Sequence, residues 1–288
     1  KKVGVAAFLP TTMSASPEDT VKALAGVKAV MDRPEPDGAI VLGAHMEAPF
    51  LAEAKAGAQL KQYFADPNEE NWQRYTCGLE SVVRLITMAP ERAGAMEFIS
   101  ALTKKGITVS IGHTTADAET THAAAEAGAT HVTHTFNAQT PLNHRAPGVP
   151  GAALVDDRLQ CEVISDGIHL HPDIVKLIIR TKGKEKLVAI TDAMEAAGMP
   201  DGQYQLGGQE VFVHEGAARL KDGTLAGSTL TMVRAFQNLM RFGATPEEAA
   251  LMTTKTPALS IGNEELGEIE LGAPAIFSRF DENYAFKG

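Results

Sequence analysis

The chain has 288 residues, of which 44% are hydrophobic and 22% are charged, and its formal net charge is −10. This composition is typical of a globular α/β protein with a large core, either one large domain or one domain with a small appendage. The acidic balance argues against general nucleic-acid binding, and the absence of any run of about 18 apolar residues argues against a membrane span.

Short strand-like runs recur along the chain, and each ends in a polar residue or a turn. The predicted strands cover 3–9, 39–42, 82–87, 108–113, 131–134, 161–165 and 187–191. Helical patterns lie between them, at 17–31, 93–105, 116–127 and 172–182. This alternation predicts a parallel sheet, and polar residues at nearly every strand end favour a (β/α)8 barrel. Only seven strands are counted, so we expect that the first strand is missing from this chain and preceded Lys1.

The pattern changes after the last of these strands. A Gly-rich stretch at about 200–225 predicts β-hairpins, two helices are predicted at 229–242 and 246–254, and 266–272 and 275–280 are strand-like again. We therefore predict a (β/α) barrel catalytic domain over 1–265 that carries the hairpins as an insertion. Residues 266–288 are predicted to be the C-terminal strands of a small β subdomain.

Two histidines end successive predicted strands, His113 and His134, 21 residues apart. This spacing fits one βα repeat, so both imidazoles are expected at the same rim of the sheet. Glu47 follows another strand, and one carboxylate with two imidazoles suits a divalent metal with positions left open for water. Zinc or another first-row divalent ion would fit, and whether one or two ions bind stays open.

Other polar residues at strand ends are candidates for chemistry. Asp192 follows a buried apolar strand, where a carboxylate is costly unless paired, and we assign it proton transfer. Arg145, in a Pro/Gly-rich loop, offers a group that can bind phosphate or carboxylate with two hydrogen bonds. The two cysteines, Cys77 and Cys161, have no metal or redox spacing and predict a reducing, cytoplasmic compartment.

Six motifs in one order resemble the N-acetylglucosamine-6-phosphate deacetylases of the amidohydrolase superfamily, over Val3 to about Asn283. They are His45-Met46-Glu47-Ala48-Pro49-Phe50, His131 to Ala138, His144 to Gly148, Ser165 to His169, Thr191-Asp192-Ala193 and Leu225 to Met232. The resemblance implies a TIM-like barrel with a small β-sandwich and a homodimer. It also implies a cytoplasmic enzyme that removes acetate from N-acetylglucosamine 6-phosphate and gives glucosamine 6-phosphate.

The resemblance assigns roles residue by residue. Glu47, His113 and His134 would bind the metal, and Asp192 would be the catalytic acid and base. The sugar phosphate would contact residues on several loops, namely Ala58, Gln59, Asn137, Ala138, His169, Leu225, Ala226 and Gly227. Arg145 would bind phosphate in the neighbouring subunit.

The chain departs from the family pattern at three places. The strand with the His-x-His metal pair is absent, Ala48 replaces a glycine, and Gln59 replaces a histidine thought to polarise the acetamide carbonyl. Gln59 can donate a neutral hydrogen bond but carries no charge. Two alternatives therefore stay open: a deacetylase of another amino-sugar phosphate, such as N-acetylgalactosamine 6-phosphate, and a sugar-phosphate-binding pseudoenzyme.

Overall fold

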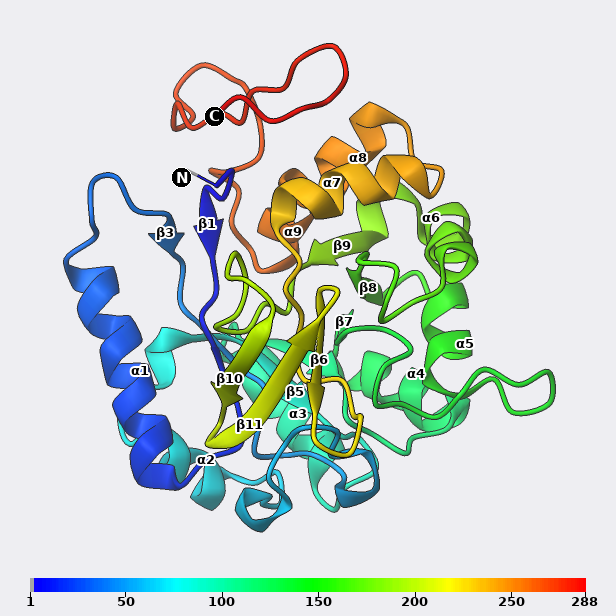
Figure 1. Cartoon of the computed structure of the whole chain (residues 1–288). Coiled ribbons are helices and arrows are strands. Elements are labelled where there is room, and N and C mark those ends of the chain that lie inside the picture. Colours follow the sequence, from blue (N-terminus) through cyan, green and yellow to red (C-terminus); the bar gives the residue numbers. More distant parts are fainter. Residues whose placement is uncertain (1–2) are drawn as a thin grey trace. The chain divides into compact units, whose positions relative to one another are not determined.

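A computed structural model describes residues 3–288, which form two compact units (Figure 1). One unit spans residues 7–159, and the other spans residues 160–288 together with residues 3–6. We call them the 7–159 unit and the 160–288 unit and describe each by itself.

The 7–159 unit is built on five parallel strands that are neighbours in the order β2-β4-β5-β6-β7. They are β2 (Thr11–Thr12), β4 (Ala44–Met46), β5 (Val83–Met88), β6 (Thr108–Ile111) and β7 (His131–Val132). A separate parallel pair joins β1 (Ala7–Phe8) to β3 (Ile40–Val41). Because parallel strands have their carboxyl ends at one edge, the residues that follow β4, β6 and β7 meet there.

Helices alternate with these strands. They are α1 (Pro17–Asp32), α2 (Glu69–Thr76), α3 (Ala95–Lys104), α4 (Ala118–Ala127) and α5 (Gly148–Val155), with short 3-10 helices η1 (Glu53–Lys55), η2 (Lys61–Tyr63) and η3 (Glu80–Val82). Side chains at the N-caps begin α1 and α4, where Ser16 and Asp117 accept backbone N–H groups. Gly128 ends α4, as its position after an alanine-rich run predicts.

The 160–288 unit continues the same alternation and then changes character. Parallel strands β8 (Gln160–Ile164) and β9 (Leu187–Ile190) are joined by α6 (Pro172–Lys186). An antiparallel sheet follows, made of β10 (Gly202–Leu206), β11 (Gln209–His214) and β12 (Ala217–Leu220). Three helices come next, α7 (Met232–Arg241), α8 (Pro246–Thr253) and α9 (Lys255–Ser260). The predicted hairpins are thus confirmed.

The five parallel strands β2, β4, β5, β6 and β7 of one unit and the two of the other match the predicted number of seven. However, β2 and β4 lie beyond the predicted runs 3–9 and 39–42, which contain β1 and β3 instead. No helix among the described residues is long and apolar enough to cross a membrane. Helices α2, α5 and α9 were not predicted. Helix α5 begins with Gly148 and contains Pro150, two residues of low helix propensity, so its sequence does not predict a helix.

Four strand predictions were wrong in detail. The run 3–9 is not one strand, because the strand hydrogen bonds begin at Ala7 and are split between β1 and β2 around Pro10, which has no N–H to donate. Of the run 39–42 only Ile40–Val41 is a strand, β3, and β4 begins after Gly43, beyond the predicted run. The segments 266–272 and 275–280 form no strand in the described part of the chain, where Phe280 and Phe286 make only an isolated bridge. A strand needs a run of hydrogen bonds to a partner, whereas here only the end of the second segment is paired, through the backbone of Arg279 with Lys287 and Gly288.

Candidate metal centre and active site

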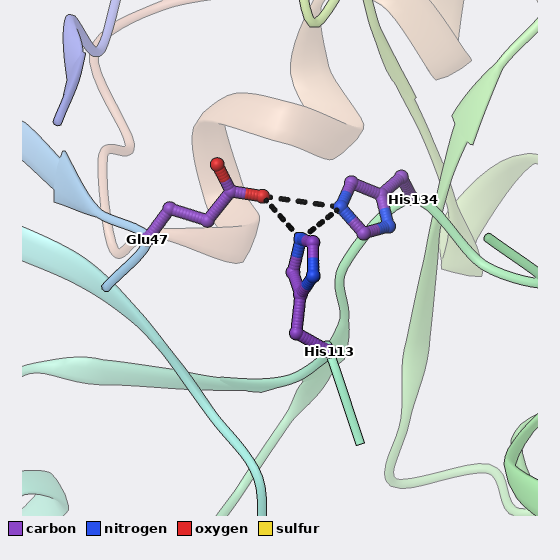
Figure 2. Close-up of side chains that lie close together, drawn as sticks. All are labelled: Glu47, His113 and His134. Atoms are coloured by element: carbon purple, nitrogen blue, oxygen red, sulfur yellow. Dashed lines mark hydrogen bonds and ion pairs between the residues drawn. The ribbon is translucent and has the colours of Figure 1, made fainter. Parts of the chain in front are cut away.

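Three side chains converge at the carboxyl edge of the 7–159 sheet (Figure 2). Glu47 directly follows β4, whereas His113 and His134 each lie two residues beyond β6 and β7. The Oε1 atom of Glu47 lies 3.1 Å from Nε2 of His113 and 3.1 Å from Nε2 of His134, and the two Nε2 atoms are 3.1 Å apart. All three residues are buried, with exposed fractions of 5–7%. Their convergence is as predicted, and their role as metal ligands stays a prediction.

A hydrogen bond at Nδ1 of His113, the ring nitrogen that points away from Glu47 and His134, determines the protonation of the other nitrogen, Nε2. Its Nδ1 lies 2.7 Å from the carbonyl oxygen of Lys55, in η1. A carbonyl only accepts, so in the neutral ring Nδ1 carries the hydrogen and Nε2 presents a lone pair. That lone pair faces a carboxylate oxygen and a second imidazole nitrogen.

A cation bound between these three atoms would remove the repulsion among them. Three electron-rich atoms that face one point repel one another unless a proton or a metal ion lies between them. Glu47, His113 and His134 would hold a divalent ion through these three atoms, which lie 3.1 Å from one another. The donor set therefore fits a first-row divalent ion.

The backbone at both histidines has an uncommon conformation. The φ angles of His113 and His134 are 45° and 30°, in the left-handed region that few residues other than glycine adopt. Backbone hydrogen bonds hold these carbonyls: Ala52 donates to His113 and Asn137 donates to His134, each at 2.9 Å. Such conformations persist only where surrounding contacts over-determine them, and they are concentrated at functional sites.

Two side chains without a predicted role hold the loops that follow the histidines. The carboxylate of Glu91 accepts hydrogen bonds from the hydroxyl groups of Thr114 and Thr115 and from the backbone N–H of Thr115. The buried amide of Gln139 accepts from Phe136 N–H and donates to the carbonyl of Thr133. Glu91 follows the predicted strand at 82–87, and this position near a strand end is the sequence feature that could have identified it. No feature of the sequence around Gln139 indicates its role.

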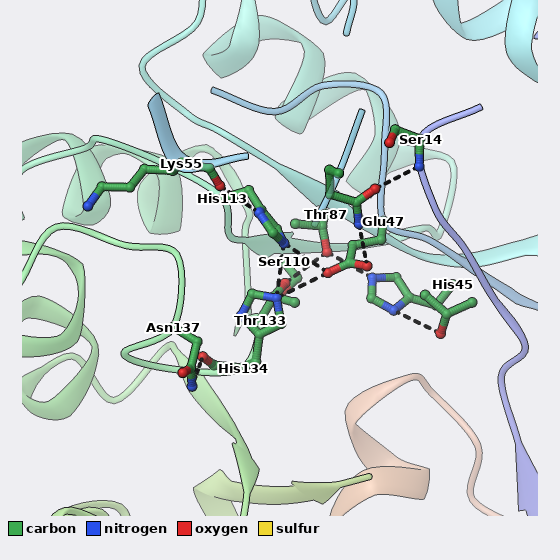
Figure 3. Close-up of polar contacts among 12 residues, drawn as sticks. Ser14, His45, Glu47, Lys55, Thr87, Ser110, His113, Thr133, His134 and Asn137 are labelled. Atoms are coloured by element: carbon green, nitrogen blue, oxygen red, sulfur yellow. Dashed lines mark hydrogen bonds and ion pairs between the residues drawn. The ribbon is translucent and has the colours of Figure 1, made fainter. Parts of the chain in front are cut away.

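A chain of buried hydroxyls lies beside the cluster (Figure 3). His45 Nε2 contacts Thr87 Oγ1 at 2.8 Å, Thr87 contacts Thr133 Oγ1 at 2.8 Å, and Ser110 contacts the same Thr133 oxygen at 2.6 Å. Burial lowers the pKa of His45 to about 4, partly opposed by the charge of Glu47. His45 is therefore neutral at pH 7.

The carboxylate of Glu47 is held in its ionised form. Burial acts to raise the pKa of Glu47, but His113 and His134, when protons rather than an ion lie between the three side chains, hold it well below its ordinary value through hydrogen bonds and charge. The other carboxylate oxygen, Oε2, accepts from Nε2 of Gln59 at 2.9 Å. Gln59 is buried and the preceding Ala58 is half-buried, so the sequence-predicted segment does reach the cluster.

Asp192 and the 225–227 turn come together in the 160–288 unit. The carbonyl oxygen of Asp192 accepts from Ser228 N–H at 2.7 Å, and a Cβ added to Gly227 would lie 3.1 Å from that oxygen. Asp192 is half-buried and has a φ of 49°, so it is a third left-handed residue two positions beyond the end of a strand, here β9. The turn that contacts the Asp192 backbone also contains Leu225, which is half-buried, and Ala226, which is buried.

His169 is oriented by its neighbour Asp166 in the same unit. Asp166 Oδ2 lies 2.7 Å from His169 Nδ1, and its Oδ1 accepts the backbone N–H groups of Ile168 and His169. Burial acts to raise the pKa of Asp166, but these hydrogen bonds and the His169 charge hold it below its ordinary value. The pairing leaves Nε2 as the ring nitrogen of His169 that a ligand can use.

The remaining predicted residues follow His134 along the chain. Asn137 and Ala138 are half-buried, and the Ala138 carbonyl accepts from Thr114 N–H at 3.1 Å, which ties the two histidine loops together. Arg145 is exposed, in the loop between β7 and α5, and its Nη1 lies 2.8 Å from His144 Nε2. Within the 7–159 unit, therefore, Gln59 contacts Glu47 and Asn137 contacts the backbone of His134, whereas Arg145 lies in an exposed loop.

Comparison with known proteins identifies relatives over nearly the whole chain. The profile of the amidohydrolase family matches residues 10–286. An N-acetylglucosamine-6-phosphate deacetylase of Vibrio furnissii is 39% identical over 272 residues, which cover 94% of this chain and 68% of that protein. An N-acetylgalactosamine-6-phosphate deacetylase of Escherichia coli O157:H7 is 38% identical over 274 residues, covering 94% of this chain and 72% of that protein.

A solved structure has the same fold. It is an aspartate-to-alanine variant of N-acetylglucosamine-6-phosphate deacetylase from Mycobacterium smegmatis, in complex with N-acetylglucosamine 6-phosphate. Its TM-score to this chain is 0.90 at 34% identity, covering 98% of this chain and 74% of that one. These matches confirm the resemblance found in the motifs and the α/β fold of the TIM-like barrel class.

Proposed function

This chain belongs to the amidohydrolase family, and we propose that it removes the acetyl group from N-acetylglucosamine 6-phosphate, giving glucosamine 6-phosphate and acetate. The observation that carries the proposal is the convergence of Glu47, His113 and His134 on one point, with the lone pair of His113 facing the carboxylate. A protein that only binds a sugar phosphate has no need of such a cluster. The similarity to deacetylases over 94% of the chain supports the substrate class.

The chain's own residues divide the chemistry between them. Glu47, His113 and His134 would hold one divalent ion, with zinc the first candidate, and when bound such an ion lowers the pKa of water and polarises a carbonyl. Asp192 takes a proton from the attacking water and returns it to the leaving amine. The second step is needed because an amide nitrogen leaves only when protonated.

Recognition of the sugar phosphate is assigned to the loops around these residues. Asn137, Ala138, His169 and the 225–227 turn would contact the substrate, and Ala58 and Gln59 would lie on its acetamide side. Arg145 would reach the phosphate of the neighbouring subunit in a homodimer, which its exposed loop position supports. The cysteine pattern supports a cytoplasmic location.

A second candidate substrate is N-acetylgalactosamine 6-phosphate. The relative that acts on it is 38% identical, against 39% for the relative named for the glucosamine isomer, so identity does not separate the two. The isomers differ only in the configuration at C4, and a substrate panel separates them.

The test is metal content together with acetate release from both isomers. His113→Asn removes the proposed ligand Nε2, and asparagine tolerates the positive φ at this position. We expect it to lose bound metal and acetate release together. His171→Asn is the matched control, because His171 is an exposed N-cap of α6 and asparagine caps equally well.

Wild-type protein that binds metal but releases no acetate from either isomer would refute the proposed activity and favour a binding protein. A His113→Asn variant with wild-type metal content would remove that residue from the metal site.

A further inference from the structure

The side chain of Gln59 joins the metal cluster to a distant backbone segment. Its Nε2 lies 2.9 Å from Oε2 of Glu47, and its Oε1 lies 2.7 Å from the backbone nitrogen of Ser14, just beyond β2. The connection is reciprocal, because the N–H of Leu60, next to Gln59, donates to the hydroxyl of Ser14. Gln59 and Ser14 are both buried, at 8% and 2% exposure.

These two partners fix the orientation of the amide. A backbone N–H only donates, so the atom that faces Ser14 must be the amide oxygen. An ionised carboxylate only accepts, so the atom that faces Glu47 must be the NH2 group. No flipped amide satisfies both neighbours, and the side chain is therefore held in one arrangement.

The consequence concerns Glu47. Its Oε2 is occupied by the Gln59 amide, while its Oε1 faces the two imidazoles at 3.1 Å. We propose that Gln59 is a positioning residue that fixes Glu47 as a ligand through one oxygen only. It holds Oε2 away from the ion and tethers the carboxylate to the 11–14 segment. This inference rests on the metal site of the proposed function but not on its substrate.

The two hydrogen bonds of Gln59 account for a glutamine at a position where the family that this chain resembles has a histidine. An amide donates to Glu47 at any pH, whereas an imidazole does so in only some of its protonation states. Groups that orient a metal ligand from behind commonly change metal affinity 10- to 100-fold when they are removed. Gln59 is such a group for Glu47.

The test measures zinc affinity by competition with a chelator, without using activity. Gln59→Met keeps the length of the side chain but removes both hydrogen bonds, and we expect zinc to bind roughly 10- to 100-fold more weakly. Gln59→Glu keeps the shape but places a carboxylate against Glu47, and it should weaken zinc binding as well. Gln59→His restores a donor and should recover part of the affinity.

The control is Gln73→Met. Gln73 also donates to a carboxylate, that of Glu69 at 2.8 Å, but on the exposed face of α2, so zinc affinity should stay unchanged. A second readout is the rise in unfolding temperature that zinc produces, which depends on ion affinity and should shrink in Gln59→Met. A merely structural role would lower the unfolding temperature equally with and without zinc.

Zinc affinity of Gln59→Met within twofold of wild type would overturn the inference, and so would a wild-type chain that binds neither zinc nor cobalt. Weaker zinc binding in Gln59→Met, with no acetate release from any substrate by the wild type, would uphold it while refuting the proposed activity.

Discussion

Asp192→Asn is the substitution that best isolates proton transfer. The residue has a φ of 49°, and asparagine is among the few residues that adopt this conformation readily, so the backbone should not move. The bonds that hold the turn use the backbone of Asp192, whose carbonyl accepts from Ser228 N–H at 2.7 Å, and they are untouched by the change. The change replaces the carboxyl group by an amide of nearly the same shape, which cannot exchange a proton.

The expected loss in kcat is about 10²- to 10⁴-fold, the usual size of a general acid–base contribution, or about 3–5 kcal/mol in the activation barrier. The assay is steady-state acetate release, with metal content and unfolding temperature measured alongside. Asp192→Ala is the comparison: it should lose the same activity and also about 1 kcal/mol of stability, because alanine is strained at this φ. A kcat for Asp192→Asn within tenfold of wild type would remove Asp192 from the reaction.

Three further predictions follow from the same structure. Gly112→Ala should lower the free energy of unfolding by about 1–3 kcal/mol in urea denaturation, since its Cβ would lie 2.7 Å from Cβ of Thr133; unchanged stability would show that the hydroxyl chain yields easily. His45, with a pKa of about 4 in the folded chain against 6.5 when unfolded, should make metal-free protein less stable as pH falls from about 6.5 to 4, because the unfolded chain takes up the proton first. The loss approaches about 3 kcal/mol, and a His45→Asn variant with the same pH slope would contradict the assignment. Arg145→Ala should raise KM for the phosphorylated sugar roughly 10- to 100-fold with less effect on the unphosphorylated one. Mixing these subunits with Asp192→Asn subunits should restore activity only if Arg145 acts across a dimer.

Sequence patterns were enough to predict the class of the fold and the three residues that converge, Glu47, His113 and His134. Strand and helix periodicity is local, so the alternating elements were readable without any contact information. The placement of Glu47, His113 and His134 at one edge followed from a general property of parallel strands, whose carboxyl ends meet. A rule that needs only chain order was enough to bring residues 66 and 87 positions apart to one site.

Tertiary structure alone decided how those residues are held. The carbonyl of Lys55 selects the nitrogen that His113 presents, and the amide of Gln59 donates to Oε2 of Glu47. Neither contact has a sequence signal, because each depends on how loops pack after the strands have paired. The same reason explains why residues 266–280 do not form the predicted strands. Its side-chain pattern is that of a strand, but strands form only with a hydrogen-bonding partner, and pairing is a property of the folded chain rather than of the segment.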